Sequence, residues 1–167
     1  MMTPERQGWL QVELGDRLTE RIVAGELFRP RGAWGDRPMR LRRFAFRHLG
    51  LGELHPVERR MALLNLAVAT PERLLLFRLG GSWRRISVED EIAGWPLGEL
   101  RTSHERHRVE SKRFAASAGS TFTTMEYESK LRTLRIEPTR EAALEIDLAD
   151  SRDANALLEA LEARPGR

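Results

Sequence analysis

Apolar and polar residues alternate along much of the chain after residue 61, and a period of two predicts strands. The clearest example is residues 142–149, where every second position is aliphatic. Two short apolar runs between Ala62 and Leu79 flank a turn signal at Pro71. Proline fixes its own φ and holds the preceding residue in extended geometry, so these runs cannot form one helix. They predict a hairpin whose strands are largely buried.

Further strands are expected after a second turn signal, Gly80-Gly81, and the tally from Ala62 onward is about seven. Segment 103–113 is charged at positions of both parities, so we expect it at an edge of the sheet or extending beyond the core. Pro96 cannot donate to a strand ladder and marks an edge or a bend. The remaining expected strands are 83–88, 92–101, 122–129 and 131–137, with Glu89-Asp90-Glu91 as a solvated turn.

A first helix is predicted at the N-terminus. Thr3-Pro4-Glu5 has the N-cap, the proline and the acid of a helix start. Gly15-Asp16 can split this helix, and Gly25 is a candidate end. We interpret it as a helix on the core rather than a membrane-surface or partner-binding helix, because acids dilute its polar face. Its apolar stripe follows four-residue steps through Leu10, Leu14, Leu18 and Ile22.

A second amphipathic helix is predicted near the C-terminus, after the strand that ends at Leu148. Asp150 or Ser151 is its N-cap. Its apolar stripe, at helical spacing, is Ala154, Leu157, Leu158 and Leu161. The fold class expected from the whole pattern is α+β and mainly β, with about seven strands followed by this C-terminal helix.

The composition is that of an ordinary globular protein. The chain has 167 residues, 41% of them hydrophobic, which fits one domain with a self-sufficient core. No stretch has the ~18 apolar residues of a membrane span, and the N-terminus lacks a signal-peptide pattern. Without cysteine there is no disulfide, thiolate metal site or thiol nucleophile. We therefore expect a cytoplasmic protein without a transmembrane segment.

Charge is distributed unevenly along the chain, although the net charge is only +3. Residues 27–60 carry nine arginines against three acids, and residues 137–163 carry eight acids against two arginines. The basic stretch either binds an anionic partner or pairs with the acidic C-terminal third. Arginines beside aromatic residues suit nucleic acid or an acidic lipid surface. The candidate anion-binding residues are Arg29, Arg31, Arg37, Arg40, Arg42, Arg43 and Arg47.

Residues 1–60 differ in pattern from the rest of the chain. Pro30, Gly32, Gly35 and Pro38 indicate a loop, and Met39–Leu49 fits a strand better than a short helix. We assign residues 1–60 to an N-terminal extension, a helix plus an Arg-rich loop, packed on the same domain. Residues 61–167 form the main domain.

Three segments resemble bacterial pleckstrin-homology-like (PH-like) and GRAM-type domains, over roughly residues 62–163. Val68–Phe77 resembles the "threonine, turn, arginine, leucine, leucine" hairpin of those families. Trp95–Leu100 resembles their strand with a proline-leucine pair, and Ala142–Leu161 resembles their last strand and helix. The resemblance implies two bent antiparallel sheets with an open corner plugged by the last helix. It implies little about function, because this superfold has many functions.

One departure from that family bears on the ligand. Phosphoinositide-binding relatives carry basic residues around the first hairpin loop, whereas this loop is the tight Thr70-Pro71-Glu72-Arg73. An acid within the loop disfavours binding of inositol phosphates there. Binding of anionic lipid through the Arg29–Arg47 stretch stays open as a nonspecific contact.

No motif in the sequence predicts catalysis or a cofactor. His104-Glu105-Arg106-His107 is one residue short of the spacing of zinc proteases, and on a strand the two rings point to opposite faces. We therefore expect no metal at His104, Glu105 and His107, no catalytic residues and no bound cofactor. The preferred function is a non-enzymatic binding or scaffolding module that recognises a protein partner or its own copy. The alternatives are an anionic-surface binder and an enzyme of unrecognised type.

Overall fold

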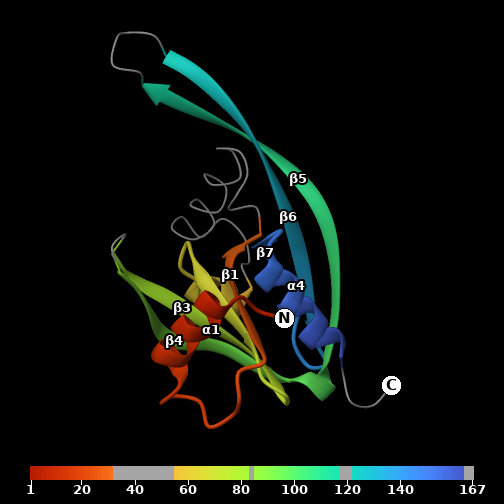
Figure 1. Ribbon diagram of the computed structural model, residues 1–167. Helices are drawn as coiled ribbons and strands as arrows, with labels where there is room; N and C mark the ends of the chain where they lie inside the picture. The colour runs from red at the N-terminus through yellow and green to blue at the C-terminus, as the bar shows by residue number, and fades with distance from the viewer. Residues whose placement is uncertain (32–54, 83–84, 117–121, 164–167) are drawn as a thin grey trace.

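The computed structural model describes residues 1–31, 55–82, 85–116 and 122–163, and the side chains of 82 and 110–129 are not considered. These residues form a seven-stranded antiparallel sheet with helices on it (Figure 1). The fold is α+β and mainly β, as predicted. The strand order is β4-β3-β2-β1-β7-β6-β5, and the sheet is open, with β4 and β5 at its two edges.

The strands vary widely in length. The first four are β1 Ala24–Pro30, β2 Asn65–Ala69, β3 Arg73–Ser82 and β4 Arg85–Pro96. A 3-10 turn, Leu97–Glu99, leads into β5 Leu100–Ala116, followed by β6 Phe122–Pro138 and β7 Leu144–Ala149. The predicted hairpin at Ala62–Leu79 corresponds to β2 and β3, and its strands are buried as expected.

The central strand comes from the segment that the sequence pattern assigns to an extension. β1 pairs with β2 from Ala24↔Ala69 to Phe28↔Asn65, and with β7 at Phe28↔Leu148. The sequence analysis predicted no strand at these positions: it took Gly25 as a candidate helix end and Pro30 as part of a loop, and the structure corrects this. The sequence pattern of β1 is difficult to recognise, because the strand has only seven residues and the charged Glu26 occupies a position on its buried face.

Two other expected boundaries were wrong. Segments 122–129 and 131–137 are parts of one strand, β6, because β5 pairs with it along its whole length. Glu89-Asp90-Glu91 lies within β4 rather than in a turn. Arg78 on the neighbouring strand β3 contacts the Glu89 and Asp90 carboxylates, which stabilises these acids within a strand. The edge position of segment 103–113 is confirmed, since it belongs to β5.

Three helices cover the sheet within the described residues. α1, Pro4–Leu14, is capped by Thr3, and α3 is the single turn Pro56–Arg60. α1 ends at Gly15, so Leu18 and Ile22 lie in the connection to β1. α4 is Arg152–Glu162, and its N-cap is Ser151, which is one of the two residues predicted for this position. It contacts β1 and β2 and buries Leu157, Leu158 and Leu161, so the predicted C-terminal helix is confirmed.

The hairpin of β5 and β6 extends beyond the body of the sheet. β7 pairs with β6 only from Leu131 to Ile136, whereas β5 and β6 stay paired as far as Ala116↔Phe122. Figure 1 shows this hairpin projecting past the other strands. None of the helices described in the structure has the length and apolar content needed to cross a bilayer.

Candidate functional site

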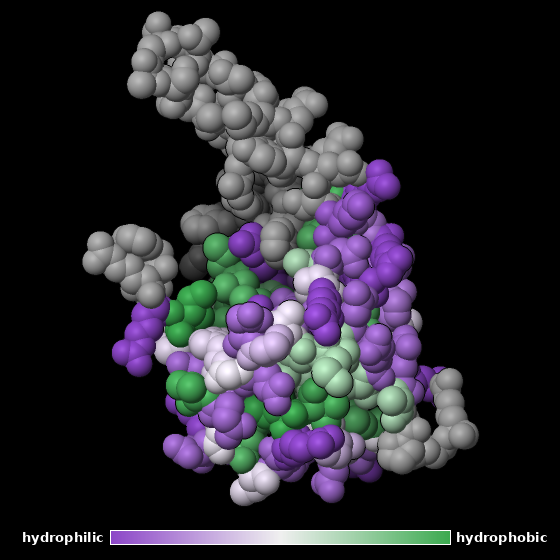
Figure 2. Space-filling view, in the orientation of Figure 1, coloured by the Kyte–Doolittle hydropathy of each residue, from purple (hydrophilic) through white to green (hydrophobic). Residues whose placement is uncertain are grey.

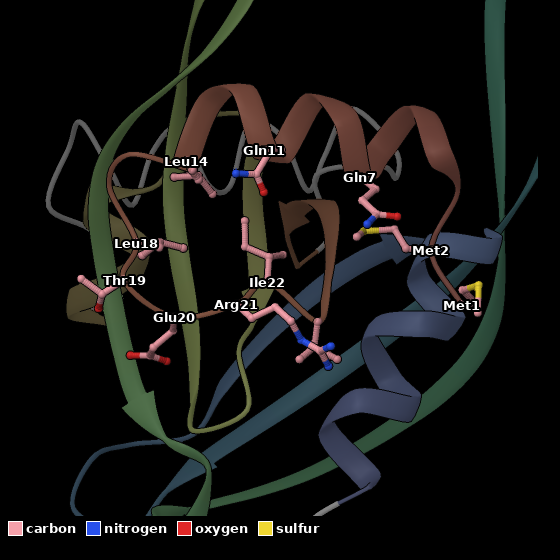
Figure 3. Close-up of a pocket in the computed structure, with 12 residues that line it drawn as sticks. Met1, Met2, Gln7, Gln11, Leu14, Leu18, Thr19, Glu20, Arg21 and Ile22 are labelled. Carbon is pink, nitrogen blue, oxygen red and sulfur yellow. The ribbon is translucent and has the colours of Figure 1, made fainter.

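A hollow lies between α1 and the connection that follows it (Figure 3). Its volume is about 630 Å³, within the range of small-molecule pockets. Gln7 and Gln11 of α1 and the residues around Leu18 and Ile22 line it. Its acidic lining side chain, Glu20, is already engaged by groups on the β2–β3 hairpin. The hollow therefore presents amide, aliphatic and methionine side chains together with the Arg21 guanidinium, and its carboxylate is engaged elsewhere.

Glu20 joins the connection to the β2–β3 hairpin. Its carboxylate accepts a hydrogen bond from the Thr70 hydroxyl and lies 2.8 and 2.6 Å from Nε and Nη2 of Arg73. The Thr70 hydrogen bond, together with Arg73, lowers the pKa of Glu20. This arrangement anchors the tight hairpin loop to the N-terminal segment. It also leaves Arg73 neutralised, so this loop has no excess positive charge to offer a phosphate.

A polar cluster crosses the face of β1, β5, β6 and β7 that lies opposite α4. The Thr133 hydroxyl donates to Asp147 Oδ1 at 2.8 Å, and His107 Nδ1 lies 3.3 Å from it. Arg31 Nη1 also donates to this hydroxyl. One hydroxyl has one proton and two lone pairs, so these three partners saturate it. Thr133 is therefore positioned to link strands rather than to attack a substrate.

The predicted anion-binding residues fall into two groups. Arg31 Nη1 lies 3.8 Å from carboxylate oxygens of Glu105 and Asp147, and its Nε lies 3.8 Å from Glu145. Its charge is thus balanced by acids, mostly of the C-terminal third. Arg29 is half-buried and opposite Asp147 in the β1–β7 register. The other five lie outside the described residues, as does Met39–Leu49: Arg37, Arg40, Arg42, Arg43 and Arg47.

The histidines of segment 104–107 are separated, as expected for a strand. His104 Nε2 lies 3.1 Å from Glu162 Oε1 of α4, whereas His107 contacts Thr133 on the opposite face. Among the residues that the structure describes, no group of three or more His, Cys, Asp or Glu side chains is arranged to hold a metal ion.

A buried polar cluster joins α1, β1 and α4 and was not predicted. Glu26 is 4% exposed, and its carboxylate accepts from the Leu27 amide at 2.9 Å and the Ser151 hydroxyl at 3.0 Å. Arg6 lies 3.6 Å from Glu26 and 3.7 Å from Asp153, which in turn accepts hydrogen bonds from Thr3. These contacts fasten both terminal helices to the central strand.

Glu26 should make the protein less stable as the pH rises. Burial raises its pKa, and Arg6 offsets part of this rise. The folded state therefore keeps the Glu26 proton at pH values where the unfolded state has lost it. The stabilisation is fully present below the unfolded pKa and is lost as the pH rises through the folded pKa. We expect Glu26→Gln to be at least as stable as the wild type at pH 7.

Urea unfolding at pH 5 and pH 7 tests this expectation. At each pH, the free energy of unfolding of the wild type minus that of the Glu26→Gln variant isolates the contribution of Glu26 from those of other acids. Glu26→Ala is the contrasting variant, because it leaves the Ser151 hydroxyl and the Leu27 amide without their acceptor and should be destabilised at both pH values. A Glu26→Gln variant that is less stable than the wild type at pH 7 but not at pH 5 would contradict the assignment.

The two edges of the sheet differ in how their backbone groups are satisfied. At β4, the Val88 amide donates to Glu13 Oε2 at 3.0 Å. Arg17 donates to the carbonyl oxygens of Val88 and Glu89 at 2.9 and 2.7 Å. Arg60 donates to those of Glu91 and Ile92, each at 2.9 Å. Side chains from α1, the following turn and α3 therefore cover the β4 edge and block pairing with another strand.

The outer edge of β5 at residues 101–109 is not paired with any strand that the structure describes. Figure 1 draws no strand or helix alongside it. Every residue from 101 to 109 is exposed or half-buried. In Figure 2, hydrophilic side chains gather on the side of the molecule where β5 and β6 run. An uncovered edge of this kind can accept an additional strand.

Four cations lie together on the α4 side of β5 and β6. The register pairs His104 with Leu134, Arg106 with Arg132 and Arg108 with Lys130. Directly opposite residues share a face, and Leu134 belongs to the core beneath α4. Arg132 is buried and donates to Asp150 at 2.7 Å. We call Arg106, Arg108, Lys130 and Arg132 the basic cluster.

The sequence predicted the edge strand but not the basic cluster. The charges on both parities of segment 103–113 indicated that it lies at an edge, as β5 does. Arg106 and Arg132 are 26 positions apart in the chain, and only the β5–β6 register brings them together. Had residues 122–138 been predicted as one continuous strand, its pairing with β5 would have placed Arg106 opposite Arg132.

Comparisons with known proteins give no relatives: no protein-family model, no curated protein and no solved structure matches this chain.

Proposed function

We propose that this chain is a non-enzymatic protein-binding module, cytoplasmic and of PH-like architecture, that recognises an extended segment of a partner protein. The segment would add as a further strand along β5. The observation that carries the proposal is the contrast between the two edges of one sheet. Glu13, Arg17 and Arg60 cover the β4 edge, whereas residues 101–109 of β5 are exposed or half-buried and no described strand covers their outer edge.

The PH-like assignment is part of this proposal. Strands β1 to β4 are consecutive neighbours, as are β5 to β7, and β1 meets β7 between the two groups. The two edge strands β4 and β5 are not paired with each other, and the C-terminal helix packs on the sheet. Both features support two antiparallel units with an open corner. They say nothing of the ligand, which we infer from the edges.

Strand addition suits this edge energetically. Main-chain hydrogen bonds supply affinity for any extended segment, and side chains at alternate positions supply specificity. The alternative of an anionic-surface binder through Arg29–Arg47 stays open; among its described residues, Arg31 is balanced by carboxylates. Self-association through β5 would be strand addition between two copies of this chain, and sedimentation distinguishes it from binding of another protein.

Selection from a random peptide library displayed on phage tests the proposed function. We expect binders whose addition slows hydrogen exchange of β5 amides between residues 101 and 109, with little change in β4. A strand that pairs with β5 points every second N–H toward it. Methylation of the peptide nitrogens one at a time should therefore weaken binding strongly at alternate positions and weakly between them.

Two results would contradict this function. The first is a set of binders that protect amides elsewhere and leave β5 unchanged. The second is a methylation series without a period of two. Sedimentation of the protein alone separates self-association, which would appear as a concentration-dependent dimer with protection of the same β5 amides.

A further inference from the structure

The hollow between α1 and the connection to β1 is bordered by polar groups that have no partner among the described residues. Gln7 and Gln11 lie one helical turn apart, and Figure 3 shows their side chains extending from α1 toward the connection. Neither side-chain amide makes a hydrogen bond to a described group. An amide offers both a donor and an acceptor, so this wall can pair with the amides of a ligand.

The opposite wall of the hollow offers backbone groups. Residues 19–22 belong to no helix or strand, and their backbone N–H and C=O groups make no hydrogen bond within the described part of the chain. The next amide, that of Val23, donates to the Ala69 carbonyl oxygen at 2.9 Å, so pairing with β2 begins only there. Unpaired backbone groups of this kind can bind the main chain of an extended peptide.

Arg21 gives the hollow a positive charge. It is the basic residue of the lining, it is exposed, and it has no ion pair with any described residue. In Figure 3 its side chain leaves the connection in the direction opposite to that of Glu20, whose carboxylate is held by Arg73. The neighbouring acid therefore does not neutralise Arg21. A guanidinium suits a carboxylate because it can donate two parallel hydrogen bonds to it.

The hollow also has an apolar side, where Leu18 and Ile22 point into the space beside the buried Leu14. A simple fatty acid would use this side and Arg21, but it would leave the glutamine amides and the backbone groups without partners. Polar groups that lose water without gaining a partner cost binding free energy. A ligand that matches the whole lining therefore has a carboxylate, amide groups and aliphatic side chains.

We propose that this hollow binds a short aliphatic peptide by its C-terminal carboxylate. Arg21 holds the carboxylate, and Gln7, Gln11 and the backbone of residues 19–22 pair with the peptide amides. The volume of about 630 Å³ is that of a site for a small ligand. The lining contains no residue of β5, so this inference does not depend on the proposed strand addition.

Isothermal titration calorimetry of the full chain with acetyl-Leu-Val-Leu tests the inference. The matched control is the same peptide with a C-terminal amide, which lacks the negative charge. Hydrogen bonds to charged groups contribute more than those between neutral groups, so we expect the amide form to bind about tenfold more weakly. Arg21→Gln should weaken binding of the acid form to a similar extent and remove the difference between the two forms. No binding of the acid form at millimolar concentrations would overturn the inference.

Arg140→Gln is the control for Arg21→Gln. Both arginines are exposed and have no described partner, but Arg140 lies in the turn between β6 and β7, away from the lining. We expect Arg140→Gln to change the affinity by less than about twofold. Equal weakening by both variants would overturn the inference, because it would show only a general attraction of the peptide to positive charge. Circular dichroism confirms that each variant is folded.

Gln11→Met tests the amide wall, because it removes the amide and keeps an unbranched side chain. We expect it to weaken binding of the acid and amide forms alike, by about threefold. Hexanoate should bind more weakly than the peptide, since it lacks amides. Tighter binding of hexanoate would overturn the inference in favour of a fatty-acid site.

Hydrogen exchange locates the bound peptide and separates this site from the proposed function. We expect slower exchange of the amides of residues 19–22 and no change between residues 101 and 109 of β5. Protection confined to β5 would overturn this inference and leave strand addition standing. Failure of the phage selection to give binders at β5 would overturn strand addition and leave this site standing.

A free peptide and the C-terminus of another protein share this chemistry, and a longer peptide distinguishes them. The probe is acetyl-Leu-Val-Leu extended at its N-terminus by six residues. Unchanged affinity identifies the C-terminus of a protein as the ligand, and strongly reduced affinity identifies a free short peptide. Either result supports the carboxylate site, provided that the C-terminal amide form binds more weakly.

Discussion

A chain that consists of residues 61–167 alone is expected not to fold. Residues 1–60 include β1, which pairs with β2 on one side and β7 on the other. Without β1, the sheet divides into β2–β4 and β5–β7, and two inner strands become edges. The buried side chain of Phe28 would also be lost from the core, together with the α1 residues Leu10 and Leu14. Removing Phe28 alone should cost about 3–5 kcal/mol.

Expression of the two lengths side by side tests this expectation. The full chain should show a cooperative thermal transition and dispersed amide resonances, and the 61–167 fragment should show neither. A peptide of residues 1–31 added to the fragment serves as the control, because it restores β1 and α1 without a covalent link. A cooperative transition in the fragment alone would show that the sheet does not need its central strand.

Leu157→Ala should be the most damaging single substitution in α4, by about 2–5 kcal/mol. Leu157 is fully buried, and α4 contacts β1 and β2 at the centre of the sheet. Truncation leaves a cavity between the helix and these strands, and the close-packed surroundings fill it only in part. Leu158 and Leu161 are also buried, so their substitution by alanine should destabilise the protein by the same mechanism.

Denaturant unfolding of Leu157→Ala and of Glu159→Ala measures this effect. Glu159 is on the exposed face of the same helix, so its substitution should change the free energy of unfolding by less than about 0.5 kcal/mol. Leu157→Met, which preserves most of the volume, should cost less than about 1.5 kcal/mol. A loss for Leu157→Ala no greater than that for Glu159→Ala would mean that α4 does not seal the core.

Local patterning predicted the elements whose signal lies within a few residues. Alternation identified β7, the turn at Pro71 identified the β2–β3 hairpin, and the apolar stripe with its Ser151 cap identified α4. The charges of segment 103–113 placed β5 at an edge. In these elements the spacing of apolar and charged residues indicates which face is buried, because apolar residues recur on the face that packs on the core.

The tertiary structure alone decided which strands are neighbours. Glu26 interrupts the apolar face of β1 and is tolerated there because Ser151 and Arg6, distant in sequence, satisfy its carboxylate. The basic cluster exists because the β5–β6 register sets Arg106 opposite Arg132. A period of two tells which face a residue is on but not which residue faces it across the ladder. Those pairings depend on contacts between distant segments, and the proposed binding edge follows from them.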